Sequence, residues 1–155
     1  MNILYIDFTL KYKSLDIYVA GCSGNPHCSQ CHNRESWDFN QGELYNSQYF
    51  LKIKKQVIEF DLLIDNIMIF GGEPLDQNYL YLLNMMTDLK TLDKKIWLFT
   101  RYELNEVPLE IKVLCDYIKT GKYIPELATE DNIQYGIKIA SSNQKIHKIE
   151  WEELV

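Results

Sequence analysis

The sequence has 155 residues, a length that one hydrophobic core can serve, so we expect a single domain spanning residues 1–155. Hydrophobic residues make up 46% and charged residues 25%, which excludes a disordered or fibrous chain. The net charge of −6 comes without a basic stripe, so nucleic acid is not an expected partner.

No export signal or membrane-spanning stretch is recognisable. Residues 1–13 lack the basic segment and apolar run of a signal peptide, and no later stretch approaches eighteen apolar residues. We therefore expect a cytoplasmic protein with no membrane partner.

The first half of the chain predicts two strands, a long loop and a helix. Residues 3–8 and 16–20 have the composition of strands. Residues 21–42 form a polar loop rich in turn formers, and such a loop in a compact domain usually binds a metal or ligand that compensates for its ordering. Residues 47–60 have a helical apolar pattern, with Ser47 as the candidate N-cap.

The second half alternates strands with helices. Residues 64–70 are a nearly continuous apolar run, typical of a strand covered on both faces. The further expected elements are a helix at 78–89, a strand at 95–99, a short helix at 107–114, a strand at 115–119 and a closing pair of strands at 137–140 and 145–149. This alternation predicts an α/β fold with right-handed crossovers and a mainly parallel sheet.

Ligands of parallel sheets bind at the carboxyl ends of the strands. The loop 21–42, the turn Gly71-Gly72-Glu73 and the pair Thr100-Arg101 each follow an expected strand. We therefore expect these three segments to converge on one rim of the sheet.

Three cysteines, Cys22, Cys28 and Cys31, lie within ten residues of this loop. In a chain without an export signal, clustered thiols more often bind metal than form disulfides. A cubane [4Fe–4S] cluster takes one thiolate per iron, so three cysteines leave one iron open to another ligand.

A structural zinc site is the alternative. Structural zinc is bound by four ligands, and only Cys28 and Cys31 have the spacing of a zinc knuckle. The other ligands would have to come from His27, His32, Cys22 or Cys115. Thiolates suit both zinc and iron–sulfur clusters, so the spacing alone leaves both open. Cys115 stands in an apolar segment that reads as a strand, and we expect it in the core.

The residues around the cysteines break this tie. Residues 31–38, Cys-His-Asn-Arg-Glu-Ser-Trp-Asp, resemble the stretch that closes the cluster loop in the activases of glycyl-radical enzymes, a family of the radical S-adenosylmethionine (SAM) superfamily. Residues 70–75, Phe-Gly-Gly-Glu-Pro-Leu, look like its glycine-glycine-acid-proline turn. Residues 96–102, 116–124 and 140–144 are similar to further segments of its smallest group, the activases of anaerobic ribonucleoside-triphosphate reductase.

The resemblance implies a partial (βα) barrel of the radical SAM type, with a [4Fe–4S] cluster and SAM as cofactors. It implies that Cys22, Cys28 and Cys31 are the metal ligands and that no catalytic residue acts beyond them. The residues implied to contact SAM or to order its site are Gln30, His32, Asn33, Gly71, Gly72, Glu73 and Thr100. Thr100 and Glu73 have alternative structural uses, the latter as a helix cap.

Two features depart from the usual pattern of the radical SAM superfamily, and one departs from that of the reductase activases. Five residues separate Cys22 from Cys28 where three are common in radical SAM loops. Gln30 stands where an aromatic residue is frequent, and Arg101 stands where a glycine is usual. Arg101 is therefore expected to narrow the rim or to meet a different partner surface.

The implied activity is that of a radical SAM oxidoreductase. It would cleave SAM reductively and make a glycyl radical in anaerobic (class III) ribonucleotide reductase, with a flavodoxin- or ferredoxin-type electron donor. One alternative is a radical SAM enzyme that acts on another protein or a small molecule. Another is a non-catalytic zinc or iron–sulfur adaptor.

Overall fold

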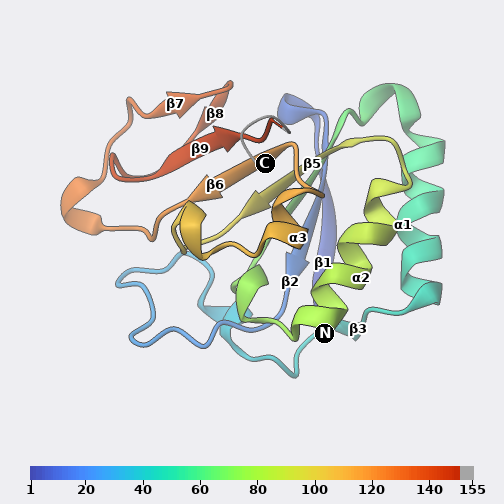
Figure 1. Cartoon of the computed structure of the whole chain (residues 1–155), viewed down its shortest axis with the longest axis horizontal. Coiled ribbons are helices and arrows are strands. Elements are labelled where there is room, and N and C mark those ends of the chain that lie inside the picture. The colour runs from blue at the N-terminus through green and yellow to red at the C-terminus, as the bar shows by residue number, and fades with distance from the viewer. Residues whose placement is uncertain (151–155) are drawn as a thin grey trace.

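The computed structural model describes residues 1–150 (Figure 1); residues 151–155, the end of the expected domain, lie outside the described residues. The strands and α-helices are, in chain order, β1 (Asn2–Thr9), β2 (Ser14–Val19), β3 (Glu43–Leu44), α1 (Ser47–Glu59), β4 (Asn66–Gly71), α2 (Tyr79–Lys90), β5 (Lys95–Phe99), α3 (Leu109–Lys112), β6 (Tyr117–Thr120), β7 (Ile133–Gln134), β8 (Ile137–Lys138) and β9 (Lys145–Lys148).

Seven of these strands form one sheet in the order β3-β1-β2-β4-β5-β6-β9. The four central strands β2, β4, β5 and β6 are parallel, while β1, β3 and β9 pair antiparallel at the edges. The α/β class with a parallel centre is as predicted, although the whole sheet is mixed. The strands β3 and β9 are the two edges of this sheet, so the sheet is open. The partial barrel of the radical SAM type stays a prediction.

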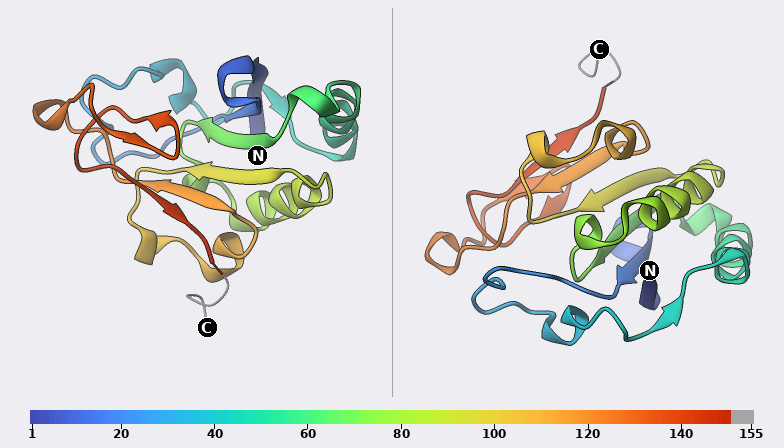
Figure 2. Two further views of the ribbon diagram at one scale, coloured as in Figure 1. Left: turned by 90° about the horizontal axis from the view of Figure 1, so that it is seen from above. Right: turned by 60° about the horizontal axis from the view of Figure 1, so that its bottom comes forward.

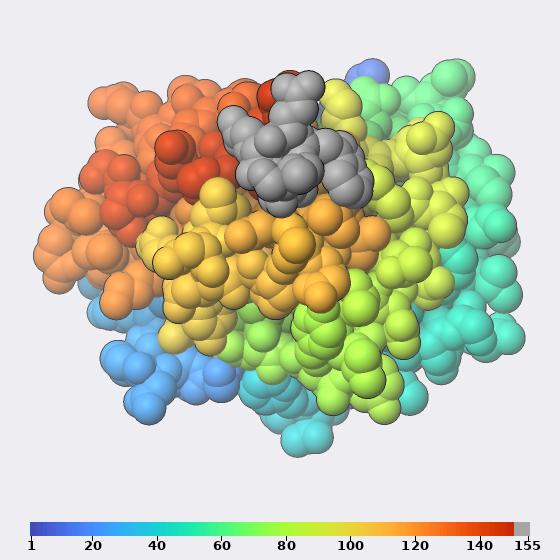
Figure 3. Space-filling view, viewed as in Figure 1, coloured from blue at the N-terminus to red at the C-terminus, as the bar shows by residue number. Residues whose placement is uncertain are grey.

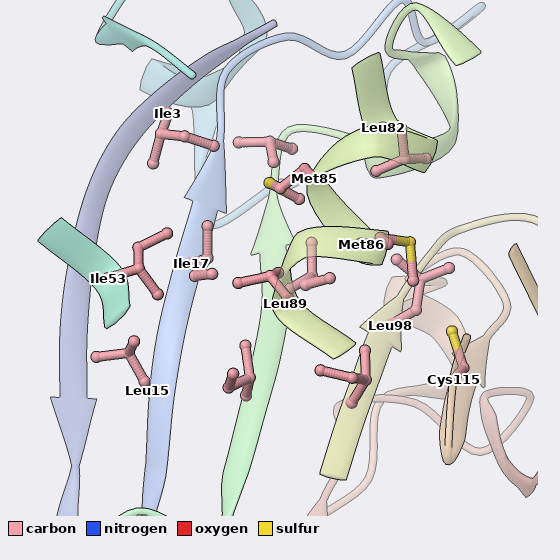
Figure 4. Close-up of a cluster of buried hydrophobic side chains, with 14 of the residues drawn as sticks. Ile3, Leu15, Ile17, Ile53, Leu82, Met85, Met86, Leu89, Leu98 and Cys115 are labelled. Carbon is pink, nitrogen blue, oxygen red and sulfur yellow. The ribbon is translucent and has the colours of Figure 1, made fainter. Parts of the chain in front are cut away.

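The main hydrophobic core lies between the sheet and the three α-helices. Figure 4 shows Ile53 of α1, Met85 of α2 and Ile17 of β2 among the side chains of this core. Along β4, Ile67 and Ile69 belong to this core, and the residue between them, Met68, belongs to a second cluster on the opposite face. This alternation is the period of a strand, and it explains why residues 64–70 read as an apolar run.

The second face of the sheet carries the hairpin β7–β8 and the cysteine loop, residues 21–42, as the two views of Figure 2 show. Ile137 and Ile139 pack there with Met68, Trp97 and Ile146. The helices and the cysteine loop therefore do not compete for the same face.

Asparagine side chains set the starts of the two longer helices. The side chain of Asn46 accepts a hydrogen bond from the amide of Tyr49, and Asn78 caps α2 in the same way. The N-cap of α1 is therefore Asn46 and not Ser47. Both residue types are common N-caps, so the sequence alone does not distinguish these two neighbours.

Strands form in both of the expected closing segments, as β8 and β9, but the two strands do not pair with each other. Residues 137–138 pair with β7, and β9 pairs with β6. The reason is a tight turn: Tyr135 has φ 50° and Gly136 has φ 78°, the left-handed conformations that a two-residue hairpin requires. β9 is then free to cover the open edge of β6.

The region around Cys115 also differs from expectation. The short helix spans Leu109–Lys112 rather than 107–114, because it begins after Pro108. The strand β6 begins at Tyr117, so Cys115 lies before it and not within it. Cys115 is buried in the main core, as predicted, and its thiol donates to the carbonyl of Ile111.

Within residues 1–150, none of the helices combines the length and the apolar character that crossing a membrane requires.

Candidate cluster and cofactor site

A cavity of about 330 Å³, here called the site cavity, opens at the carboxyl ends of the parallel strands. In Figure 3 the blue atoms of the cysteine loop lie at the lower left, against the yellow and orange atoms of the segments that follow β5 and β6. The expected convergence is confirmed, since all three segments contribute to the lining. The lining residues are Tyr18, Cys22, Cys28, Cys31, His32, Asn33, Ser36, Trp37, Phe70, Gly71, Gly72, Glu73, Phe99, Thr100, Arg101, Lys119, Gly121, Lys122, Tyr123, Ala140 and Gln144.

Gln30 is the one expected site residue that does not line the site cavity. It has φ 56°, a left-handed conformation that turns the chain between Cys28 and Cys31. Its backbone therefore shapes the loop, while its predicted contact with SAM stays a prediction.

The thiols of Cys22, Cys28 and Cys31 are free and half-buried. No three His, Cys, Asp or Glu side chains of residues 1–150 gather closely enough to hold a single metal ion. A cubane instead places each thiolate on a different iron, so its ligands stand farther apart than ligands of one ion. Three free thiols around one cavity, with no fourth cysteine there, fit a cluster with an open iron.

The immediate surroundings act on two of these thiols. Burial raises the pKa of Cys22, partly offset by a hydrogen bond from the amide of Gly24. The amide of Asn33 donates to the sulfur of Cys31 over 3.5 Å. Hydrogen bonds of this kind tune a thiolate ligand, which gives Asn33 a direct structural link to the predicted cluster.

Backbone hydrogen bonds hold the start and end of the loop against the sheet. The amide of Gly21 donates to the carbonyl of Ser36 over 2.7 Å, and the amide of Cys22 donates to the carbonyl of Trp37 over 3.2 Å. The amide of Glu73 in turn donates to the carbonyl of Gly21 over 2.7 Å. The loop is thereby fixed to the turn that follows β4.

Gly71 and Gly72 are needed for this close approach. Gly71 has φ 124°, and a Cβ atom there would collide with the backbone of Val19. At Gly72 a Cβ atom would collide with the carbonyl oxygens of Gly21 and Ser36. The double glycine therefore does more than make a tight turn, because it lets the cysteine loop pack on the strand end.

The Glu73 carboxylate is buried at 2% exposure and accepts three hydrogen bonds. The donors are the amide of Leu75 (3.0 Å), the hydroxyl of Thr100 (2.7 Å) and the amide of Arg101 (2.8 Å). Burial raises the pKa of Glu73, and these three bonds oppose the shift. The expected capping role is confirmed, and Thr100 has the structural use that was its alternative.

His27 and Trp37 close the cysteine loop on itself. Their rings stack with centroids 3.8 Å apart and 13° between the planes, and Nε2 of His27 lies 2.8 Å from the carbonyl oxygen of Cys22. Trp37 thereby fixes the loop. His27, which the sequence offers only as a candidate zinc ligand, fixes the loop as well, and no spacing pattern predicts this contact.

Three aromatic residues form a floor of the site cavity that sequence reasoning missed. Tyr18, Phe70 and Phe99 come from neighbouring strands, with ring centroids 5.3 Å and 4.2 Å apart. Each of them is the last or the next-to-last residue of its strand. An aromatic residue at the end of three neighbouring strands is the sequence pattern that could have predicted this floor.

The segments 120–124 and 140–144 complete the site cavity from the other side. Ring centroids of Tyr123 and His32 lie 5.6 Å apart, and the side chain of Gln144 donates to the carbonyl of Gly121 over 3.0 Å. Lys119 was also missed: its ammonium donates to the same carbonyl over 2.8 Å, and burial lowers its pKa to about 8.

Arg101 brings a second cation to the lining. Its guanidinium stands 5.4 Å from the ring centroid of Tyr102. Burial acts to lower the pKa of Arg101, but attraction to the ionised forms of Cys22, Tyr102, Cys28 and Asp76 outweighs it and raises the pKa. The guanidinium therefore lies within electrostatic reach of two of the predicted cluster ligands.

Comparison with known proteins agrees with this geometry. Residues 13–147 match the family described as a 4Fe-4S single cluster domain. The chain is 30% identical over 138 residues to an anaerobic ribonucleoside-triphosphate reductase-activating protein of Haemophilus influenzae, covering 85% of each chain. It is 29% identical, with the same coverage, to the protein of that name from Vibrio cholerae. The chain therefore belongs to the 4Fe-4S single cluster domain family and is a relative of these reductase-activating proteins.

Proposed function

We propose that this protein is a radical SAM activase that makes a glycyl radical in anaerobic (class III) ribonucleotide reductase. The observation that carries the proposal is the convergence of three free thiols with the Gly71-Gly72-Glu73 turn on one cavity. The names of the two relatives support the choice of the reductase as partner. Residues 1–155 would then act as one radical SAM domain.

Cys22, Cys28 and Cys31 are the proposed ligands of a [4Fe–4S] cluster. When bound and reduced, the cluster would supply the electron that splits SAM into methionine and a 5′-deoxyadenosyl radical, which takes a hydrogen atom from a glycine of the reductase. A flavodoxin- or ferredoxin-type protein is the proposed electron donor.

The chain's own residues are proposed to bind SAM, to orient it and to exclude water from the site. His32, Asn33, Gly71 and Gly72 line the site cavity and are the proposed positions of close contact with SAM. Glu73 and Thr100 already bond to each other, so their proposed part is to hold the rim rigid, with ligand contacts through the acceptor capacity that remains. The aromatic floor keeps water from one wall of the site cavity.

The test is anaerobic reconstitution of the cluster followed by two assays. The first measures 5′-deoxyadenosine after addition of SAM and a reductant, and the second records the glycyl radical by electron paramagnetic resonance after addition of the purified reductase. We expect product in the first assay and a radical signal in the second.

Other outcomes select among the alternatives. SAM cleavage without a radical in the reductase would reject this partner and favour a radical SAM enzyme with a different substrate. One zinc per chain after anaerobic purification, without iron or sulfide, would reject the activity altogether.

A further inference from the structure

Apart from the three cysteines, the site cavity carries more positive than negative side chains. Its lining includes the cations Arg101, Lys119 and Lys122 and a single carboxylate, Glu73, whose oxygens already accept three hydrogen bonds. This excess stands out in a chain whose net charge is −6. A cavity with unpaired positive charge is built for a ligand with negative charge.

Of the two partly buried cations that line the site cavity, Arg101 and Lys119, Arg101 is the less engaged. Within residues 1–150 its guanidinium makes no hydrogen bond and no ion pair, and its one neighbour of note is the ring of Tyr102. Its backbone, in contrast, is fixed, because its amide donates to Glu73 over 2.8 Å. The side chain therefore starts from a fixed point in the lining of the cavity that Cys22 and Cys28 also line, and it offers free donors to that cavity.

We infer that Arg101 raises the reduction potential of the cluster. This rests on the proposed assignment of Cys22, Cys28 and Cys31 as ligands. A [4Fe–4S]²⁺ core with three thiolates has a net charge of −1, and one-electron reduction makes it −2, so a nearby fixed cation stabilises the reduced state more than the oxidised state. Arg101 is a positioning residue in this account, since it acts through charge and forms no bond to the cluster.

The experiment compares the midpoint potential of the reconstituted protein with that of three variants, Arg101→Lys, Arg101→Gln and Arg101→Glu. The potential is measured by anaerobic titration followed by electron paramagnetic resonance, without SAM, so that binding of SAM does not enter. Because the guanidinium has no hydrogen-bond partner in the described chain, its removal leaves no buried group unpaired.

Arg34→Gln is the matched control. Arg34 belongs to the loop that carries the three cysteines, and its guanidinium stands 5.9 Å from the ring centroid of Trp37. Unlike Arg101, it does not line the site cavity. We expect Arg101→Gln to lower the ratio of reduced to oxidised cluster about tenfold at a fixed potential, which is about 59 mV for a one-electron couple. Arg101→Glu lowers it further, while Arg101→Lys and Arg34→Gln leave it within about twofold.

Equal potentials for the Gln variant and the wild type would overturn the inference. So would an equal shift in Arg101→Lys, or a shift in Arg34→Gln as large as that in Arg101→Gln. Any two of the Arg101 variants suffice for the comparison of charge. If the wild type assembles its cluster but does not cleave SAM, the proposed function fails while the potentials still decide the role of Arg101.

Discussion

The carboxylate of Asp76 accepts a hydrogen bond from the backbone amide of Ser23 over 2.8 Å, and its other oxygen accepts one from the hydroxyl of Tyr102 over 2.6 Å. Ser23 follows the first cysteine, and Tyr102 follows β5. One side chain thus links the cysteine loop to the ends of two strands. A second carboxylate, Asp88, accepts a bond from the hydroxyl of Tyr45 far from the loop.

Asp76→Ala is therefore expected to weaken cluster binding more than the fold. Loss of bonds to a charged group costs about 1–3 kcal/mol of unfolding free energy. Asp88→Ala removes a comparable bond to a tyrosine and serves as the control. We expect a similar loss of stability in both variants by denaturant unfolding, but faster loss of iron to a chelator only in Asp76→Ala. Equal rates of iron loss would contradict the link.

Gly72→Ala tests the close approach of the cysteine loop to the strand end. The new Cβ would collide with two carbonyl oxygens of the loop, and such overpacking typically costs about 1–3 kcal/mol. We expect a folded protein that takes up much less than one cluster per chain, measured as iron and sulfide content.

Gly136→Ala is the counterpart, because a Cβ there meets no atom within 4 Å although φ is +78°. It carries backbone strain without crowding, so it should lose stability and retain full cluster content. Full content in Gly72→Ala would show that the loop moves away at no cost to the site.

Glu73→Gln tests the buried carboxyl at the rim. Burial raises the pKa of Glu73 above its ordinary value of 4.5, so the folded state holds the proton more tightly than the unfolded state. The free energy of unfolding of the wild type, taken relative to the Gln variant, must then fall as the pH rises through 4.5 and on to the folded pKa. Unfolding of the cluster-free proteins by denaturant at several pH values measures this difference.

Asp16→Asn separates burial from site function. Burial also raises the pKa of Asp16, which accepts bonds from Ser14 and Thr9 away from the site cavity. We expect the same sign of pH dependence as for Glu73→Gln. Only Glu73→Gln should weaken SAM binding to the loaded protein, and a difference from wild type that does not vary with pH would contradict the shift.

Single replacements of Cys22, Cys28 and Cys31 by Ala are expected to abolish SAM cleavage, because each removes one anchor of the predicted cluster. Cys115→Ala should keep the cleavage activity and lose about 1 kcal/mol of stability, since Cys115 packs in the main core. Thermal unfolding and the 5′-deoxyadenosine assay distinguish these effects. Full cleavage activity in Cys28→Ala would overturn the ligand assignment.

Periodicity and composition were sufficient for the central part of this fold. The apolar runs that became β4 and β5 and the helical pattern of α1 were all found within a few residues, because buried strands and amphipathic helices have distinct periods. The rule that parallel strands present ligands at their carboxyl ends then brought Cys22, Gly72 and Thr100 together correctly.

Other features depend on contacts that a sequence pattern does not contain. The stacking of His27 on Trp37 joins residues on the two sides of an irregular loop. The pairing of β9 with β6 follows from the hairpin turn at Tyr135 and Gly136, and strand composition alone does not show which neighbour a terminal strand takes. Lys119 lies in strand β6, and its place in the site cavity depends on contacts with segments distant in the sequence.

The cysteine loop contributes nothing to either hydrophobic cluster of residues 1–150: every member comes from outside residues 20–42. The hydrophobic burial that stabilises the fold therefore does not involve the loop that carries the sulfur ligands. Oxygen that destroys the inorganic centre would leave a folded, empty receptor, and a repaired centre could be installed again without new protein synthesis.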